Sequence, residues 1–135
     1  MPKILIVEDN VENRDSLSRR LQRRGYEVLT AEDGKAGLAM AQAEKPDLVL
    51  MDMNMPELDG WATLRLLRAD DQTAGVCVAM FSVKSEVRDK VSALKDGAVD
   101  YITKPFGVDE LIGRVHRILD AAGSSRNPVP SASGS

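Results

Sequence analysis

The sequence predicts an α/β fold, a doubly wound sheet of five parallel strands with five helices on its two faces. Five short apolar runs alternate along the chain with five segments in which apolar residues recur every three or four positions. The runs at 3–8 and 47–52 contain no alternating polar residues, which is typical of strands covered on both sides. This alternation of strands and helices favours parallel pairing through right-handed crossovers.

Each apolar run is interpreted as a strand, and each segment between or after the runs as a helix. The expected strands are residues 3–8, 26–31, 47–52, 76–82 and 100–103. The segment 34–43 has weak helical spacing, but Asp33 is a good N-cap for it. The other four helices each show one apolar face: Leu17 and Leu21; Trp61, Leu64 and Leu67; Val87, Val91 and Leu94; and Leu111, Val115, Ile118 and Leu119.

Length and composition exclude several classes of protein. The 135 residues suit one domain. With 18 basic and 21 acidic residues the formal charge is −3, which does not indicate nucleic acid or an anionic membrane as a partner. The opening segment is too short for a signal peptide, and no apolar run is long enough to span a membrane. The single cysteine, Cys77, cannot form an intramolecular disulfide, which indicates a reducing compartment. We therefore expect a soluble, cytoplasmic protein.

The chain is expected to form one domain over residues 1–121. Residues 122–135 are interpreted as a disordered tail, a truncated linker or an expression remnant. From Gly123 the sequence "GSSRNPVPSASGS" offers almost no apolar residue to bury.

Polar side chains stand where the expected strands end. Asp52 ends the third strand, the first strand ends on Glu8 and Asp9, the fourth on Ser82, and Lys104 follows the fifth. In an open α/β sheet the ligand site lies at the carboxyl ends of the strands, where the strand order changes direction. If the first strand lies beside the third, three carboxylates meet at that edge.

Three crowded carboxylates need a proton or a cation. Oxygen ligands suit a hard octahedral ion, Mg²⁺ above all, with Mn²⁺ as a substitute, whereas zinc is disfavoured because no His or Cys is within reach. The edge would thus combine a metal site, a carboxylate nucleophile, a lysine and a hydroxyl. These groups can bind and transfer a phosphoryl group.

Four segments carry a resemblance to a known family: "VED" at 7–9, "LMDMNMPELDG" at 50–60, "MFS" at 80–82 and "DYITKPF" at 100–106. Together with their spacing they resemble the receiver domain of two-component response regulators, and of chemotaxis regulators in particular. The match spans residues 3 to about 121. It implies the flavodoxin-like strand order 2-1-3-4-5.

The resemblance also implies a metal and phosphorylation site. Asp52 would be the phosphoacceptor. Asp9 would bind Mg²⁺ directly and Glu8 largely through water. The backbone carbonyl of Asn54 and the Asp52 carboxylate would complete the ligands.

Three further residues receive roles by the same resemblance. Lys104 would contact the phosphoryl oxygens. Ser82 would be the switch hydroxyl, and Tyr101 the switch aromatic. Each also has a simpler interpretation, because a serine at a strand end, a half-buried tyrosine and a solvated lysine are common.

The implied function is Mg²⁺-dependent phosphorylation of Asp52 by a histidine kinase or a histidine phosphotransfer protein. Phosphorylation would alter binding of a downstream protein at the face made by the fourth helix, fifth strand and fifth helix. No direct contact with nucleic acid or membrane is expected. Nor do we expect an enzyme, beyond the domain's own phosphorylation and slow dephosphorylation.

Three alternative functions fit the sequence less well. A phosphate-independent pseudo-receiver would lack part of the charged set, and all of it is present. A haloacid-dehalogenase phosphatase needs a second aspartate where Asn54 stands. A flavodoxin-like nucleotide site needs a Gly or Ser/Thr phosphate cradle where "VEDN" stands.

Overall fold

The computed structural model describes residues 2–53, 60–82, 87–104 and 106–126. Strands and helices alternate throughout these residues, as the sequence predicts. In chain order they are β1 (Lys3–Val7), α1 (Val11–Arg23), β2 (Glu27–Ala31), α2 (Gly34–Glu44), β3 (Leu48–Asp52), α3 (Gly60–Ala69), β4 (Cys77–Ser82), α4 (Val87–Lys95), β5 (Asp100–Thr103) and α5 (Val108–Arg126).

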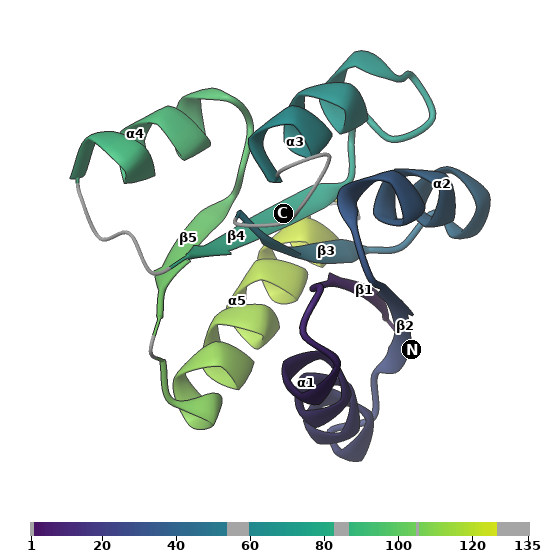
Figure 1. Cartoon of the computed structure of the whole chain (residues 1–135), viewed down its shortest axis with the longest axis vertical. Helices are drawn as coiled ribbons and strands as arrows, with labels where there is room; N and C mark the ends of the chain where they lie inside the picture. The colour runs from purple at the N-terminus through teal and green to yellow at the C-terminus, as the bar shows by residue number, and fades with distance from the viewer. Residues whose placement is uncertain (1, 54–59, 83–86, 105, 127–135) are drawn as a thin grey trace.

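The five strands form one parallel sheet in the order β2-β1-β3-β4-β5, which confirms the predicted topology (Figure 1). The switch in direction lies between β1 and β3, so the chain leaves these neighbouring strands toward opposite faces. Register aligns the strand ends: Val7 pairs with Met51, and Ser82 pairs with Thr103. All residues that follow the strands therefore meet at one edge.

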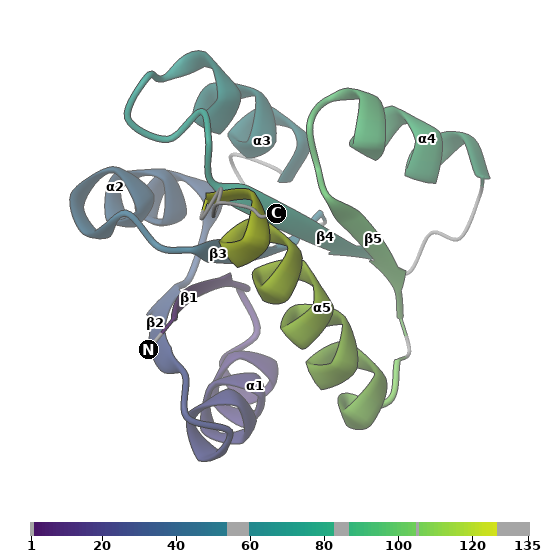
Figure 2. The ribbon, with the colours of Figure 1, turned by 180° about the vertical axis from the view of Figure 1, so that it is seen from behind.

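Helices cover both faces of the sheet. α1 and α5 lie on one face, and α2, α3 and α4 lie on the other (Figures 1 and 2). Because side chains alternate along a strand, β1 contributes Ile4 and Ile6 to the core under α1 and α5, and Leu5 and Val7 to the core under α2 and α3. β1 and β3 are apolar throughout for this reason, as expected for strands buried on both sides.

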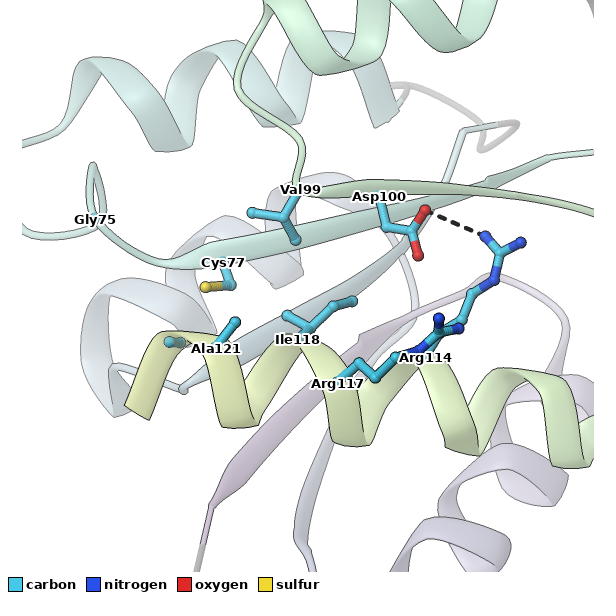
Figure 3. Close-up of a pocket in the computed structure, with 9 residues that line it drawn as sticks. Gly75, Cys77, Val99, Asp100, Arg114, Arg117, Ile118 and Ala121 are labelled. Atoms are coloured by element: carbon cyan, nitrogen blue, oxygen red, sulfur yellow. Dashed lines mark hydrogen bonds and ion pairs between the residues drawn. The ribbon is translucent and has the colours of Figure 1, made fainter. Parts of the chain in front are cut away.

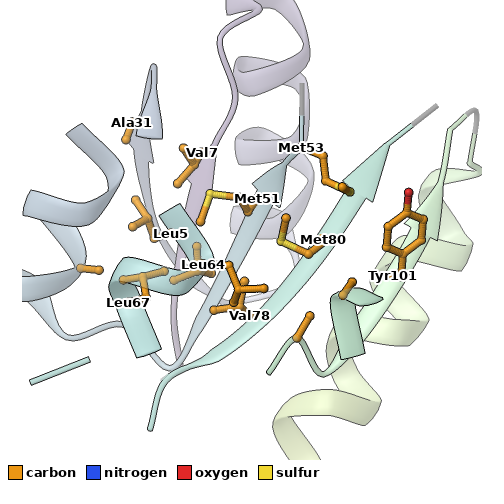
Figure 4. Close-up of a cluster of buried hydrophobic side chains, with 14 residues drawn as sticks. Leu5, Val7, Ala31, Met51, Met53, Leu64, Leu67, Val78, Met80 and Tyr101 are labelled. Carbon is orange, nitrogen blue, oxygen red and sulfur yellow. The ribbon is translucent and has the colours of Figure 1, made fainter. Parts of the chain in front are cut away.

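The core on the α2–α4 face contains side chains from all five strands (Figure 4). Leu64 and Leu67 of α3 pack onto it and are almost fully buried. Tyr101 of β5 lies at its far side and is 5% exposed. This packing holds the strands rigidly beneath the residues at their carboxyl ends.

Two helices begin with side-chain caps. The Asn10 side chain accepts a hydrogen bond from the amide of Asn13 at 2.9 Å and begins α1. Asp33 accepts one from the amide of Ala36 at 2.7 Å, which confirms the predicted N-cap of α2. Both caps satisfy amides that the first helical turn leaves without partners.

The predicted apolar face of α4 is wrong. Val91 is 45% exposed and Leu94 is 51% exposed, whereas Ala93 is fully buried. α4 has only nine residues, and helical spacing alone does not show which of two faces turns toward the sheet. The small residue packs inward, and the two large apolar residues are left on the surface.

The expected end of the domain also changes. α5 continues to Arg126, so residues 122–126, which were assigned to the tail, are helical. Ala121 and Ala122 are strong helix formers, and one glycine within a helix costs only about 1 kcal/mol. Residues 127–135 lie outside the described residues.

Within those described, no helix combines the length and apolar character that crossing a membrane requires.

Candidate functional site

The strand ends bring the predicted polar residues together. Asp52 is the last residue of β3 and is 3% exposed; Glu8 directly follows β1 and is 1% exposed. Ser82 ends β4 and is fully buried. Backbone bonds continue the sheet past the strands: the Met53 amide donates to the Phe81 carbonyl at 3.0 Å. The carboxylates are therefore held by the rigid sheet edge.

Glu8, Asp9 and Asp52 form a cluster of carboxylates. Each offers one oxygen, and these oxygens lie within 4.8 Å of one another. Glu8 and Asp52 are buried, while Asp9 is exposed. When all three are ionised, carboxylates at this spacing repel one another, and most strongly between the buried Glu8 and Asp52. The arrangement could hold a metal ion, and its oxygen ligands fit Mg²⁺.

Lys104 is the cation of the site. Its ammonium nitrogen lies 3.2 Å from Oδ2 of Asp52 and 3.7 Å from Oε1 of Glu8. It also lies 5.0 Å from the centre of the Phe81 ring. The Lys104 amide donates to the Ser82 carbonyl at 2.6 Å, so β4 fixes the point from which the side chain extends. One lysine offsets only part of the charge of three carboxylates.

Glu8 has the most perturbed environment in the cluster. Burial, followed by the nearby Asp52 and Asp9, raises its pKa from 4.5 to about 7, although the Asn10 amide acts in the opposite direction. That amide donates to Oε2 at 3.2 Å. The other oxygen, Oε1, is buried and has no hydrogen-bond partner, since Lys104 is too distant. A buried oxygen without a hydrogen bond, on a residue that belongs to a cluster of carboxylates, fits a cation site.

The structure adds residues that sequence reasoning missed. Arg14 of α1 donates from Nη1 to the Glu8 carbonyl at 2.9 Å and brings a positive charge behind the acidic pair. Gly60 begins α3 so close to the end of β3 that a Cβ there would lie 2.6 Å from the Asp52 carbonyl oxygen. Arg14 lies one helical turn into α1, and that position is the one signal that could have suggested it.

The remaining predicted residues lie beside or beyond this cluster. Tyr101 is buried in the core on the α2–α4 face and pairs in register with Met80, so its ring does not contact solvent freely. Asn54 lies outside the described residues, and its expected place among the metal ligands stays a prediction.

A separate pocket of about 780 Å³ lies away from the carboxylates, between the start of β4 and β5 and the later turns of α5 (Figure 3). Its wall includes Cys77, Val99 and Ile118. At one side Arg114 pairs with Asp100 at 3.1 Å. This pocket brings together apolar and charged groups of α5 and of the chain around the start of β4 and β5, away from the carboxyl ends of the strands.

Comparison with known proteins identifies the class. Residues 4–116 match the family model described as the response regulator receiver domain. Protein PilH of Pseudomonas aeruginosa is 40% identical over 88% of this chain and 98% of its own length. PrrA of Mycobacterium tuberculosis, a transcriptional regulatory protein, is 43% identical over 92% of this chain but 52% of its own length.

Two solved structures, each 32% identical in sequence to this chain, show the same fold. The receiver domain of Francisella response regulator 1452 has a TM-score of 0.84 and 32% identity, with 90% of this chain and 98% of that chain covered. The chemotaxis protein CheY4 of Vibrio cholerae has a TM-score of 0.82 and 32% identity, with 87% and 98% covered.

The chain therefore belongs to the receiver domains of response regulators, the signalling modules of two-component systems. Members of this class interact with histidine kinases and downstream targets, and they are not conventional enzymes. The chain spans about half the length of PrrA and of the Synechocystis regulator RpaA, which is named as DNA-binding. It spans nearly all of PilH.

Proposed function

We propose that the chain accepts a phosphoryl group on Asp52 and thereby switches its binding to a partner protein. The observation that carries this proposal is the buried Asp52 carboxylate at the end of β3, 3.2 Å from the Lys104 ammonium and clustered with Glu8 and Asp9. This set provides a nucleophile, a cation for phosphoryl oxygens and ligands for a metal ion. A pseudo-receiver would have no need of the complete set.

Glu8, Asp9 and Asp52 would hold Mg²⁺, with Asn54 expected to add its carbonyl and Mn²⁺ able to substitute. The fit is supported by the short spacing of the three carboxylates and by the buried Oε1 of Glu8, which accepts no hydrogen bond. When bound, Mg²⁺ would supply positive charge to the phosphoryl oxygens.

The transfer itself uses the Asp52 carboxylate. One of its oxygens forms a bond to phosphorus while the P–N bond of a donor phosphohistidine breaks, and the leaving imidazole takes up a proton. Acetyl phosphate can serve as a small donor, releasing acetate. Lys104 exchanges its contact with Asp52 for the new phosphoryl oxygens. Water later cleaves the aspartyl phosphate slowly.

Ser82 and Tyr101 would carry the signal onward. Ser82 ends β4 at the site, and we expect its hydroxyl to turn to the phosphoryl group. Tyr101 would shift in response, changing the face formed by α4, β5 and α5. The half-exposed Val91 and Leu94 of α4 support this face as the protein-binding surface, because exposed apolar side chains one helical turn apart form a patch of the kind that marks interaction sites.

A histidine kinase or a histidine phosphotransfer protein is the proposed donor, and a downstream protein is the proposed target. Direct nucleic-acid or membrane contact is not part of the proposal, because the formal charge is −3. We place the exchange in the cytoplasm, since Cys77 has no second cysteine with which to form a disulfide within the chain.

Intact mass after incubation with Mg²⁺ and acetyl phosphate tests the acceptor. The wild type should gain one phosphoryl group, and Asp52→Asn should gain none. Asp71→Asn, which removes an exposed carboxylate away from the cluster, should be labelled like the wild type. Equal labelling of Asp52→Asn would refute the assignment. A wild type that is never labelled would favour the pseudo-receiver.

A further inference from the structure

Arg68 of α3 is a charged side chain held by backbone carbonyls. Its Nη1 donates to the carbonyl of Val76 at 2.6 Å and to that of Ala74 at 3.1 Å, and its Nη2 donates to the carbonyl of Gly97 at 2.6 Å. Among the residues described, no carboxylate lies within ion-pair distance of it. Burial lowers the pKa of its guanidinium, so these carbonyls take the place of lost water. Arg68 thus joins two loops, the one before β4 and the one between α4 and β5, to helix α3.

The Gly97 carbonyl belongs to the C-terminal end of α4. The Gly97 amide donates to the Leu94 carbonyl at 3.1 Å, and the Ala98 amide donates to the Ala93 carbonyl at 2.9 Å. With Gly97 at φ +106, this is the Schellman arrangement that ends many helices. The Gly97 carbonyl lies just past the end of α4, close to helix carbonyls that carry partial negative charge, so a guanidinium there is favourable. Arg68 therefore caps α4 from a neighbouring helix.

Gly97 fits this contact in two ways. Its positive φ suits glycine, and a Cβ at this position would lie 2.6 Å from Nε of Arg68. The close approach of Arg68 to the end of α4 thus needs a residue without a side chain.

The rest of α4 is held lightly. Ala93 is buried, but Val91 and Leu94 are about half exposed. By contrast, α3 buries both Leu64 and Leu67. Among the described side chains of α4, little apolar area therefore resists a change in its orientation, whereas the turn that ends it is held to α3 by a charge-assisted hydrogen bond from Arg68 to Gly97.

We propose that Arg68 fixes the C-terminal end of α4 to α3, so that α4 pivots about this end when the receiver switches. The pivot rests on the proposed function. β4 ends on Ser82 at the site, and α4 begins at Val87, so a movement at the site reaches the beginning of the helix first. The anchored end turns that movement into rotation. The exposed Val91 and Leu94 then change position relative to β5 and α5.

The first test needs no phosphodonor. Amide hydrogen exchange is compared in Arg68→Met and Arg65→Met. Arg65 is a matched control, because it lies on the same helix, its side chain is 67% exposed and, among the described residues, it forms an ion pair with Asp96 at 3.7 Å rather than hydrogen bonds to backbone carbonyls. In Arg68→Met the amides of Gly97 and Ala98 should exchange about tenfold faster or more, on the basis of losing a charged hydrogen bond. In Arg65→Met they should change little.

Three comparisons make this test decisive. Amides of Leu5 and Val49 in the central strands report global unfolding, and they should accelerate far less than those of Gly97 and Ala98. Arg68→Lys should be intermediate, because one ammonium cannot reach the three carbonyls together. Equal acceleration at all sites in Arg68→Met, or equal effects in Arg65→Met, would overturn the cap.

The second test addresses the pivot. Wild type is treated with Mg²⁺ and acetyl phosphate, and intact mass confirms the adduct. Exchange should then change at Lys90 and Val91 but not at Gly97 and Ala98, whereas in Arg68→Met both pairs should change. Equal change at both pairs in the phosphorylated wild type, or no change in α4, would overturn the pivot. If no adduct forms, the proposed function fails and the pivot fails with it, while the first test still decides the cap.

Discussion

At the scale of single residues, the site is defined by an imbalance of charge. Glu8 and Asp52 are buried and share Lys104, and Asp9 adds a third carboxylate. The pKa of Glu8 is raised as a result, because burial removes water from a carboxyl group whose neighbours are also negative. In metal-free protein the fold therefore favours a proton on Glu8 near neutral pH.

This environment predicts a pH dependence of stability in metal-free protein. The folded pKa of Glu8, about 7, exceeds its ordinary value of 4.5, so the folded state binds the proton more tightly. The contribution is complete below about pH 4.5 and is lost as pH rises through about 7. It amounts to roughly 3 kcal/mol at most. Urea melts between about pH 5 and 8 should show the decline in wild type.

The control for this prediction is a pair of variants. Glu8→Gln, which does not titrate, should lose most of the decline. Glu27→Gln removes an exposed carboxylate and should retain it. Identical slopes in Glu8→Gln and wild type would show that another group is responsible.

At the scale of elements, the helices are placed so that their termini meet the site. α1 begins two residues after Asp9, and α3 begins where its backbone contacts the end of β3. The Gly60 amide donates to the Met53 carbonyl at 3.2 Å, which joins α3 to the segment after the acceptor. Such close backbone contact requires a residue without a Cβ.

Two glycines in helices should therefore respond oppositely to alanine. Gly60→Ala should destabilise the protein by about 1–3 kcal/mol, because its Cβ would meet the Asp52 carbonyl oxygen and the Met53 Cα at 2.6 and 2.7 Å. Gly113→Ala on α5 has open space around it and should stabilise the protein by about 0.5–1 kcal/mol. Denaturant midpoints of both variants measure this. A neutral Gly60→Ala would contradict the assigned contact.

At the scale of the whole molecule, the parallel sheet gathers charge at one edge. Every strand runs in the same direction, so the residues that follow β1, β3 and β5 converge there although they are distant in sequence. Their repulsion is a cost to the fold that a cation would relieve. The edge that carries the proposed chemistry is thus also a place where repulsion between like charges destabilises the fold.

Mg²⁺ should for this reason stabilise the whole domain. Addition of millimolar Mg²⁺ is expected to raise the urea midpoint of the wild type by mass action. Asp9→Asn should respond hardly at all, and without Mg²⁺ it should be at least as stable as the wild type, because one of three like charges is gone. Na⁺ at matched ionic strength separates screening from binding. A wild-type midpoint indifferent to Mg²⁺ would argue against the metal site.

Much of this architecture could be predicted from the sequence. The uninterrupted apolar runs of β1 and β3 predicted buried parallel strands, and the carboxylates that end them predicted the cluster. Asp33 was identified as an N-cap from its place before a helix. These features depend on local spacing, and strand direction then places all the strand ends together. The functional roles of the clustered residues stay predictions.

The order of the elements, the parallel sheet and the polar residues at the strand ends follow from the sequence alone, because periodic burial is local and alternating strands and helices favour parallel pairing. The tertiary structure was needed to show that Ala93, and not Val91 or Leu94, turns toward the sheet. It alone placed Arg68 against the Gly97 carbonyl, 29 residues away in the chain. Such contacts depend on how helices pack and on which carbonyls lack partners, and no local spacing encodes either.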